Sequence, residues 1–230
     1  MIDPHGFWQE LYPPGHFAPE AGGWARVYPG TLPDGRQIAL PIRVLPGDGT
    51  HAVASLIVNQ ASFAVEEALV AALAEALAPF GPELVVAVPT LGLSLAAGVA
   101  RRLGHARMLP LGTSRKFWYD EALSEPLSSI TSPDQAKRLY LDPRMLPLFA
   151  GRRVALVDDV ASSGRTLAAA LRLLARAGVV PEAAGFAMLQ GQGWRAALAA
   201  SPVPGLAVVG AMATPRLGLA EDGRWRPEEG

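Results

Sequence analysis

Cysteine is absent from the 230 residues, and lysine occurs only twice, at Lys116 and Lys137, against 18 arginines. Without cysteine the chain has no disulfide framework and no thiol chemistry, which is compatible with a cytoplasmic protein. The net charge is only −1 and no basic stripe is clustered, so nucleic acid and anionic membranes are disfavoured as partners. The most apolar run, residues 68–80, contains Glu75 and is too short to span a bilayer. These absences predict a soluble cytoplasmic protein.

Histidine is also scarce. The four histidines, at positions 5, 16, 51 and 105, have neither mutual spacing nor cysteine partners that would form a zinc site. No metal site built entirely from protein side chains is therefore expected.

Two regions differ in their pattern. Residues 1–22 carry scattered prolines and aromatics, and apolar segments at 24–28, 37–44 and 53–58 are separated by turn-forming residues. Residues 1–58 are therefore predicted to form an irregular arm followed by a small antiparallel unit, the hood. Residues 59–230 are predicted to form the main α/β domain.

Apolar strands alternate with amphipathic helices after residue 59. Strands are expected at 84–88, 108–111, 154–157, 183–189 and 206–209, and helices start at Ser62, Gly92, after Gly164 and at Trp194. This alternation predicts a doubly wound parallel sheet. Residues 112–144 show no sustained period and are predicted to form a flexible loop, and a C-terminal extension without clear pattern starts at Pro215.

The segment 154–167, Val-Ala-Leu-Val-Asp-Asp-Val-Ala-Ser-Ser-Gly-Arg-Thr-Leu, combines four features in order. A short apolar strand is followed by Asp158 and Asp159, then by a loop of small residues, then by a helical stripe. Open α/β sheets bind ligands at the carboxyl ends of their strands, and a helix N-terminus behind small polar residues binds anions. Carboxylates for hydroxyl groups and a loop for phosphate indicate a phosphorylated sugar as ligand.

This segment resembles the 5-phosphoribosyl 1-pyrophosphate (PRPP) signature of the type I phosphoribosyltransferases. The resemblance covers most of residues 60–190 and implies that Asp158 and Asp159 face the ribose hydroxyls. It also implies that the 5′-phosphate is wrapped by Ala161, Ser162, Ser163, Gly164, Arg165 and Thr166.

Two further segments occur in the order that this family shows. Thr90, Leu91 and Gly92 form a strand-to-helix turn where these enzymes bind pyrophosphate through backbone amides. Arg115 and Lys116 precede the long loop that closes over the active site in this family, which implies a catalytic role for both. The layout is most similar to that of adenine phosphoribosyltransferases. The resemblance also implies Mg²⁺, held mainly by PRPP and in part by Asp158 or Asp159 through water, and a homodimer.

Two departures from the family pattern concern the acceptor and catalysis. Leu91 stands where adenine-type enzymes usually carry an arginine, and Ser162 stands where the 6-oxopurine enzymes carry an acid. An adenine-like purine is therefore the favoured acceptor, although no motif names the base. The alternative is a protein that senses PRPP as a regulator and catalyses poorly.

Two other motifs compete with this interpretation. Residues 92–96, Gly-Leu-Ser-Leu-Ala, approach the nucleophile elbow of α/β-hydrolases, but the only downstream histidine, His105, is too close in sequence to act as base. Residues 191–196 match the dinucleotide fingerprint G-x-G-x-x-A, yet no acid follows at the distance needed for a ribose. The second motif is interpreted as a turn.

Overall fold

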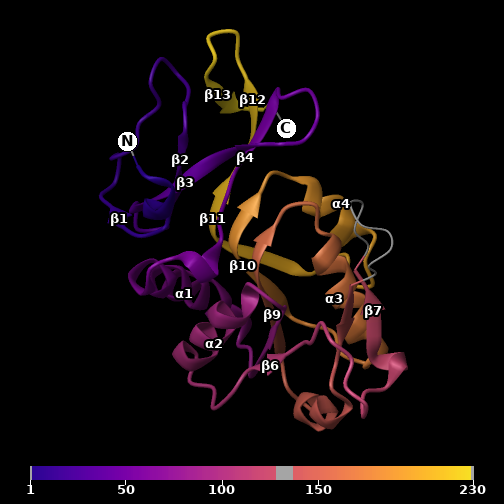
Figure 1. The fold of residues 1–230 in the computed structure, drawn as a ribbon. Helices are drawn as coiled ribbons and strands as arrows, with labels where there is room; N and C mark the ends of the chain where they lie inside the picture. Colours follow the sequence, from indigo (N-terminus) through magenta and orange to yellow (C-terminus); the bar gives the residue numbers. More distant parts are fainter. Residues whose placement is uncertain (1, 128–136, 229–230) are drawn as a thin grey trace.

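The computed structural model describes residues 2–127 and 137–228. A five-stranded parallel sheet forms the centre of the main domain, with strand order β11-β10-β9-β5-β6 (Figure 1). Its strands are β5 (Leu84–Ala87), β6 (Leu109–Pro110), β9 (Val154–Ala161), β10 (Ala183–Gln190) and β11 (Ala207–Thr214). The predicted parallel sheet is confirmed, but β9 continues four residues beyond the expected strand and β11 continues five.

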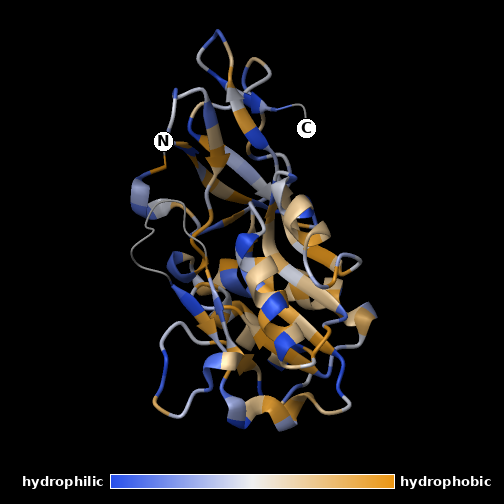
Figure 2. Ribbon diagram, turned by 90° about the vertical axis from the view of Figure 1, so that its right-hand side faces the viewer, coloured by the Kyte–Doolittle hydropathy of each residue, from blue (hydrophilic) through white to orange (hydrophobic). Residues whose placement is uncertain are grey.

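Helices cover both faces of this sheet. They are α1 (Phe63–Leu77) and α2 (Gly92–Arg102) on one face, and α3 (Arg165–Arg176) and α4 (Gly193–Ala199) on the other. Alternate strand residues divide between the faces: Val85 packs with α1 and α2, and Leu84 with α3. Apolar residues accordingly concentrate in the strands and helices of the main domain (Figure 2). The doubly wound arrangement is confirmed, and Ser62 caps α1 by accepting a hydrogen bond from the Val65 N–H at 3.3 Å.

The hood is a separate antiparallel sheet, as expected, but it uses both ends of the chain. It consists of β1 (Leu11–Tyr12), β2 (Val27–Thr31), β3 (Gln37–Val44), β4 (His51–Ala54), β12 (Arg216–Leu219) and β13 (Trp225–Pro227). The segment before β2 pairs with β13, because the Trp24 N–H donates to the Trp225 carbonyl at 2.9 Å and the reverse bond measures 2.8 Å. The C-terminal hairpin, which has no clear pattern in the sequence, therefore closes the hood.

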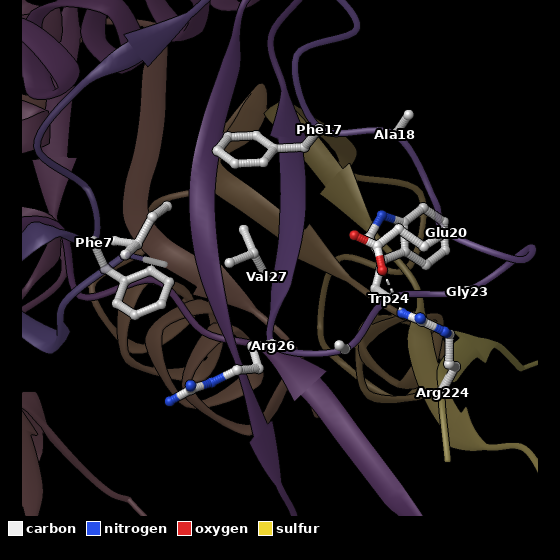
Figure 3. A pocket seen from close by; sticks show the side chains of 11 residues that line it. Phe7, Phe17, Ala18, Glu20, Gly23, Trp24, Arg26, Val27 and Arg224 are labelled. Carbon is white, nitrogen blue, oxygen red and sulfur yellow. Dashed lines mark ion pairs between the residues drawn. The ribbon is translucent and has the colours of Figure 1, made fainter. Parts of the chain in front are cut away.

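The hood packs directly on the edge of the parallel sheet. A Cβ at Gly30 of β2 would lie 2.5 Å from Met212 Sδ on β11, so a side chain at this position would force Met212 to move. Phe7 and Trp8 of the arm are buried in the same hydrophobic cluster as α1. A cavity of about 320 Å³ remains between the arm and the hairpin, where Arg224 and Glu20 form an ion pair of 2.9 Å (Figure 3).

The described part of residues 112–144 contains short strands and 3₁₀ helices, where the sequence shows no sustained period; the predicted flexibility stays a prediction. The short strands β7 (Ser124–Pro126) and β8 (Arg138–Tyr140) form a hairpin against α3. The buried Glu125 carboxylate accepts from Arg172 at 2.5 Å and pairs with Arg176 at 2.9 Å, which fixes β7 to the helix. Residues 128–136, between β7 and β8 in sequence, lie outside the described residues.

Short 3₁₀ helices complete the described chain: η1 (Pro4–Gly6), η2 (Val58–Gln60), η3 (Ala78–Phe80), η4 (Glu121–Leu123) and η5 (Pro143–Phe149). Across the described ranges, no helix combines the length and apolarity required to cross a bilayer.

Candidate functional site

The strand order places two predicted segments side by side. In chain order the parallel strands run 2-1-3-4-5 across the sheet, so the order reverses between β5 and β9. Ligands of open α/β sheets bind at this switch point, outside the carboxyl ends of the strands. The turn through Thr90, Leu91 and Gly92 follows β5, and Asp158 and Asp159 lie in the last half of β9.

Gly92 brings the turn into contact with the acid pair. A Cβ at this position would lie 2.8 Å from Asp158 Cα, 2.9 Å from Asp158 Oδ1 and 3.0 Å from the Val157 carbonyl oxygen. No side chain fits there, so α2 can begin directly against β9 only because residue 92 is glycine. Thr90 is exposed at the turn, whereas Leu91 is partly buried against the hydrophobic core and offers no charge.

The two carboxylates differ in exposure. Asp158 is 5% exposed, and Asp159 is partly exposed; the Asp159 N–H donates to Asp158 Oδ1 at 2.8 Å. Burial, and then the charge of Asp159, raise the pKa of Asp158 well above its ordinary value, and burial also raises the pKa of Asp159. Two acids placed this close together favour the binding of hydroxyl donors or of a ligand that carries a cation.

The loop after β9 forms a pocket at the N-terminus of α3. The pocket measures about 210 Å³ and is lined by residues 160–167 and Phe186, which include all six residues predicted to wrap a phosphate. Gly164 has φ +72°, a left-handed conformation that turns the loop into the helix. Free backbone N–H groups and the helix dipole make such a pocket an anion site.

Helix α4 supports this loop from behind. A Cβ at Gly164 would lie 2.8 Å from Trp194 Cα, and a Cβ at Gly193 would lie 3.2 Å from the Ser162 carbonyl oxygen. We call residues 161–166 the phosphate loop, after their predicted role. The segment Gly191–Arg195, interpreted from sequence as a simple turn, therefore holds this loop in place. Its glycine spacing is the signal that could have pointed to this role.

Arg115 and Lys116 lie on an exposed turn after β6. Arg115 Nε is 3.4 Å from Glu121 Oε2, and the Lys116 carbonyl accepts from the Tyr119 N–H at 3.0 Å. Among the described residues, no hydrogen bond or ion pair joins either side chain to the acid pair or to the phosphate loop.

The aromatic residues that follow this turn anchor it to η5. Trp118 Nε1 donates to Asp142 Oδ2 at 3.4 Å, and the Arg144 guanidinium lies 4.5 Å from the Trp118 ring centroid. Hydrogen bonds from Arg144 lower the pKa of Asp142 to about 2. Phe117, by contrast, is 94% exposed. The turn with Lys116 is thus held on one side and open to solvent on the other.

A larger cavity adjoins the phosphate loop and is not predicted from the sequence. It measures about 510 Å³ and is lined by the ends of β10 and β11, the start of α4, and Arg216 and Glu228 of the C-terminal hairpin. Two lining residues, Trp194 and Thr214, carry a buried Nε1 and a buried Oγ1 without a hydrogen-bond partner in the described chain. Buried polar atoms normally have a hydrogen-bond partner. A ligand bound in the cavity could be the partner of these two atoms.

The acid pair fits Mg²⁺ only as a partial ligand set. Within the described ranges, no group of three or more metal-ligating side chains converges. Mg²⁺ typically uses one or two carboxylates together with phosphate oxygens and water, which is compatible with Asp158 or Asp159 contributing part of its shell.

The comparisons with known proteins identify the family of this chain. The phosphoribosyl transferase domain family matches residues 54–193, which contain the turn after β5, the acid pair and the phosphate loop. The chain belongs to this family and is a phosphoribosyltransferase enzyme.

Individual relatives make the comparison more specific. The chain is 35% identical over 135 residues to adenine phosphoribosyltransferase of Mycolicibacterium paratuberculosis, covering 55% of this chain and 67% of that protein. It is also 35% identical over 118 residues to xanthine phosphoribosyltransferase of Chloroflexus aurantiacus, covering 50% of this chain and 52% of that protein. The fold is similar to that of the solved Giardia lamblia APRTase, with a TM-score of 0.57 and 20% identity over 75% of this chain and 93% of that one. Its layout is that of an adenine phosphoribosyltransferase.

Proposed function

We propose that the protein transfers the 5-phosphoribosyl group of PRPP to a purine base, with an adenine-like base favoured, and releases pyrophosphate. One observation carries this proposal: Gly92 places the turn after β5 against Asp158, one loop before a phosphate-sized pocket. The order of turn, acid pair and pocket corresponds to the order of pyrophosphate at C1, ring hydroxyls and phosphate at C5 in PRPP.

The 5′-phosphate of PRPP is bound by the loop from Ala161 to Thr166. The N–H groups at the start of α3 and the hydroxyls of Ser162, Ser163 and Thr166 supply donors, and Arg165 adds positive charge nearby. Asp158 and Asp159 accept hydrogen bonds from the ribose hydroxyls. Ionised carboxylates can only accept hydrogen bonds, and hydroxyl groups are suitable donors.

The pyrophosphate is bound by the backbone amides of Thr90, Leu91 and Gly92. Arg115 and Lys116 approach it from the exposed turn and stabilise the negative charge that develops as the C1–O bond breaks. The acceptor nitrogen then attacks C1. The residues bind, orient and exclude water, so little proton transfer is required from the protein.

Mg²⁺ would be held by oxygens of PRPP and through water by Asp158 or Asp159. When bound, it neutralises charge on the leaving pyrophosphate. Burial, and then the charge of Asp159, raise the pKa of Asp158, and a cation beside the pair would favour the ionised form of both carboxylates.

The acceptor base occupies the cavity of about 510 Å³ beside the phosphate loop. Trp194 Nε1 can only donate a hydrogen bond, so it requires an acceptor atom such as an unprotonated ring nitrogen or an exocyclic oxygen. Thr214 can donate or accept, which suits a purine with mixed edges. Relatives named for adenine and for xanthine both match at 35% identity, which supports a purine.

The test is a panel of purine and pyrimidine bases incubated with PRPP and Mg²⁺, with pyrophosphate release as the readout. Release with a purine, and none with Asp158→Asn/Asp159→Asn, is expected. Release by the double variant at the wild-type rate and PRPP affinity would contradict the donor site. PRPP binding without pyrophosphate release for any base would favour the alternative, a PRPP-sensing regulator. Leu91 motivates this alternative, because it supplies no charge where adenine-type enzymes usually carry an arginine.

We further infer a cytoplasmic homodimer that acts without nucleic acid or membrane. Light scattering after size-exclusion chromatography tests the dimer, and a monomer at micromolar concentration would contradict it.

A further inference from the structure

A second polar cavity lies at the opposite edge of the parallel sheet. It measures about 660 Å³ and is lined by segments that precede three parallel strands: residues 78–83 before β5, residues 103–107 before β6, and Arg152 and Arg153 before β9. Because these strands are parallel, this is the amino-terminal edge. Along β9 it is separated from Asp158 by roughly 15 Å or more.

The charges that line this cavity are predominantly positive. Arg153 is paired: its backbone N–H donates to Glu83 Oε2 at 3.0 Å and its Nε donates to the Gly81 carbonyl at 2.7 Å. Among the described residues, the Arg107 guanidinium forms one hydrogen bond, to Met145 Sδ at 3.4 Å, and sulfur is a weak acceptor. The Arg152 side chain has no hydrogen bond or ion pair to any described residue. Glu83, the single carboxylate of the lining, thus compensates one of three guanidinium groups.

His105 adds an unpaired polar atom to the same lining. Its Nε2 donates to the Pro82 carbonyl at 2.8 Å, because a carbonyl can only accept, so the neutral ring carries its proton on Nε2. Nδ1 is then an acceptor, and it is buried without a partner among the described residues. A ligand hydroxyl could donate to it; on the protonated ring, Nδ1–H would instead donate to an anion.

These groups together define one kind of ligand. The guanidinium groups favour anionic oxygens, and Arg pairs with carboxylate or phosphate through two hydrogen bonds. A phosphate group also carries an O–H in its monoanion form, which suits Nδ1 of His105. The volume is in the range of cavities that hold small metabolites. We propose that this cavity is a second binding site, distinct from the phosphate loop, for a small phosphate-bearing metabolite.

The test is isothermal titration of the full-length protein with inorganic phosphate and, separately, with adenosine 5′-monophosphate. The wild type is expected to bind adenosine 5′-monophosphate at two sites, and inorganic phosphate at the cavity in addition to the phosphate loop and the turn after β5. In Arg107→Ala/Arg152→Ala one site should weaken by about tenfold or more, as expected for losing charge-assisted hydrogen bonds. The matched control Arg36→Ala/Arg43→Ala removes two hood arginines and should retain both sites.

A second pair of variants separates the sites. Ser163→Ala/Thr166→Ala should weaken only the phosphate-loop site, and His105→Ala only the cavity site. A single site in the wild type, or cavity binding equal in Arg107→Ala/Arg152→Ala and in the control, would overturn the proposal. The readout is binding and not turnover, so a wild type that binds twice without transferring phosphoribosyl would refute the proposed function and leave this site standing.

Discussion

Replacing Asp158 by asparagine should make the ligand-free protein more stable at neutral pH while it destroys PRPP binding. Asp158 is 5% exposed, and burial together with the charge of Asp159 raises its pKa. The folded state therefore binds this proton more tightly than the unfolded state. The stability that follows is present below the unfolded pKa and is lost as the pH rises through the folded pKa. At pH 7 the carboxyl of the unfolded chain is ionised, so placing this group in its buried site costs free energy, and asparagine, which is neutral in both states, avoids that cost.

The free energy of unfolding is expected to rise by about 1 kcal/mol at pH 7, the usual size when an unfavourable residue of a functional site is replaced. For a chain of this length it corresponds to a rise of roughly 2–4 °C in Tm. The Oδ1 atom of the introduced asparagine can still accept the Asp159 N–H, so the bond measured at 2.8 Å is preserved. As the pH falls below the ordinary Asp pKa of about 3.9 the wild-type carboxyl becomes neutral in both states, so the gain should already shrink as the pH approaches 4.

Asp142→Asn is the matched control with the opposite sign. Hydrogen bonds from Arg144 lower the pKa of Asp142 to about 2, so its contribution to stability is present above the unfolded pKa and is lost as the pH falls toward 2. This variant should be less stable than the wild type at pH 7.

Thermal unfolding followed by circular dichroism between pH 4 and 8, in EDTA, measures both variants. The reasoning about the acid pair is refuted if Asp158→Asn unfolds at a lower temperature than the wild type at pH 7. A gain that is the same at every pH would refute the electrostatic explanation.

Three further predictions concern catalysis, packing and the hood. Lys116→Ala should lower kcat by about 10²-fold with a smaller change in KM for PRPP, as for removal of one transition-state donor; an unchanged kcat in steady-state kinetics contradicts its role. Gly92→Ala should destabilise by about 1–3 kcal/mol in urea unfolding, because its Cβ would lie 2.8 Å from Asp158 Cα, whereas Gly205→Ala, with no atom within 4 Å, should be neutral. Trp225→Ala should cost about 3–5 kcal/mol and expose the hood to proteolysis; wild-type resistance to trypsin would show that the hairpin is not needed for closure.

The parallel sheet and the acid pair could be predicted because their signals are local. Strand alternation, the Ser62 cap and the order of Asp158, Asp159 and Gly164 are each contained in a few consecutive residues. The length of β9 could not be predicted in the same way. Its last residues include two acids, which are poor strand formers, and they are held by pairing with β10.

The hood closure and the cavity beside α4 depend on contacts between residues far apart in sequence. Strand β12 (Arg216–Leu219) pairs with β4. Its sequence, which contains Gly218 and charged neighbours, does not show the alternation of apolar and polar residues that predicts a strand. Trp194 and Thr214, whose Nε1 and Oγ1 have no hydrogen-bond partner among the described residues, line the same cavity because β11 pairs with β10. Residues 112–144 have the pattern of a loop because the two strands in it have three residues each, too few for a periodic signal.

The pairing of Trp24 with Trp225 has a consequence for how the chain is made. These residues are about 200 positions apart, so the hood has a far higher contact order than the α/β domain beside it. During synthesis Trp24 stays without this backbone partner until residue 225 has emerged. The parallel sheet, whose strands lie between the two partners in sequence, can form first and present its edge strand β11, on which β2 packs.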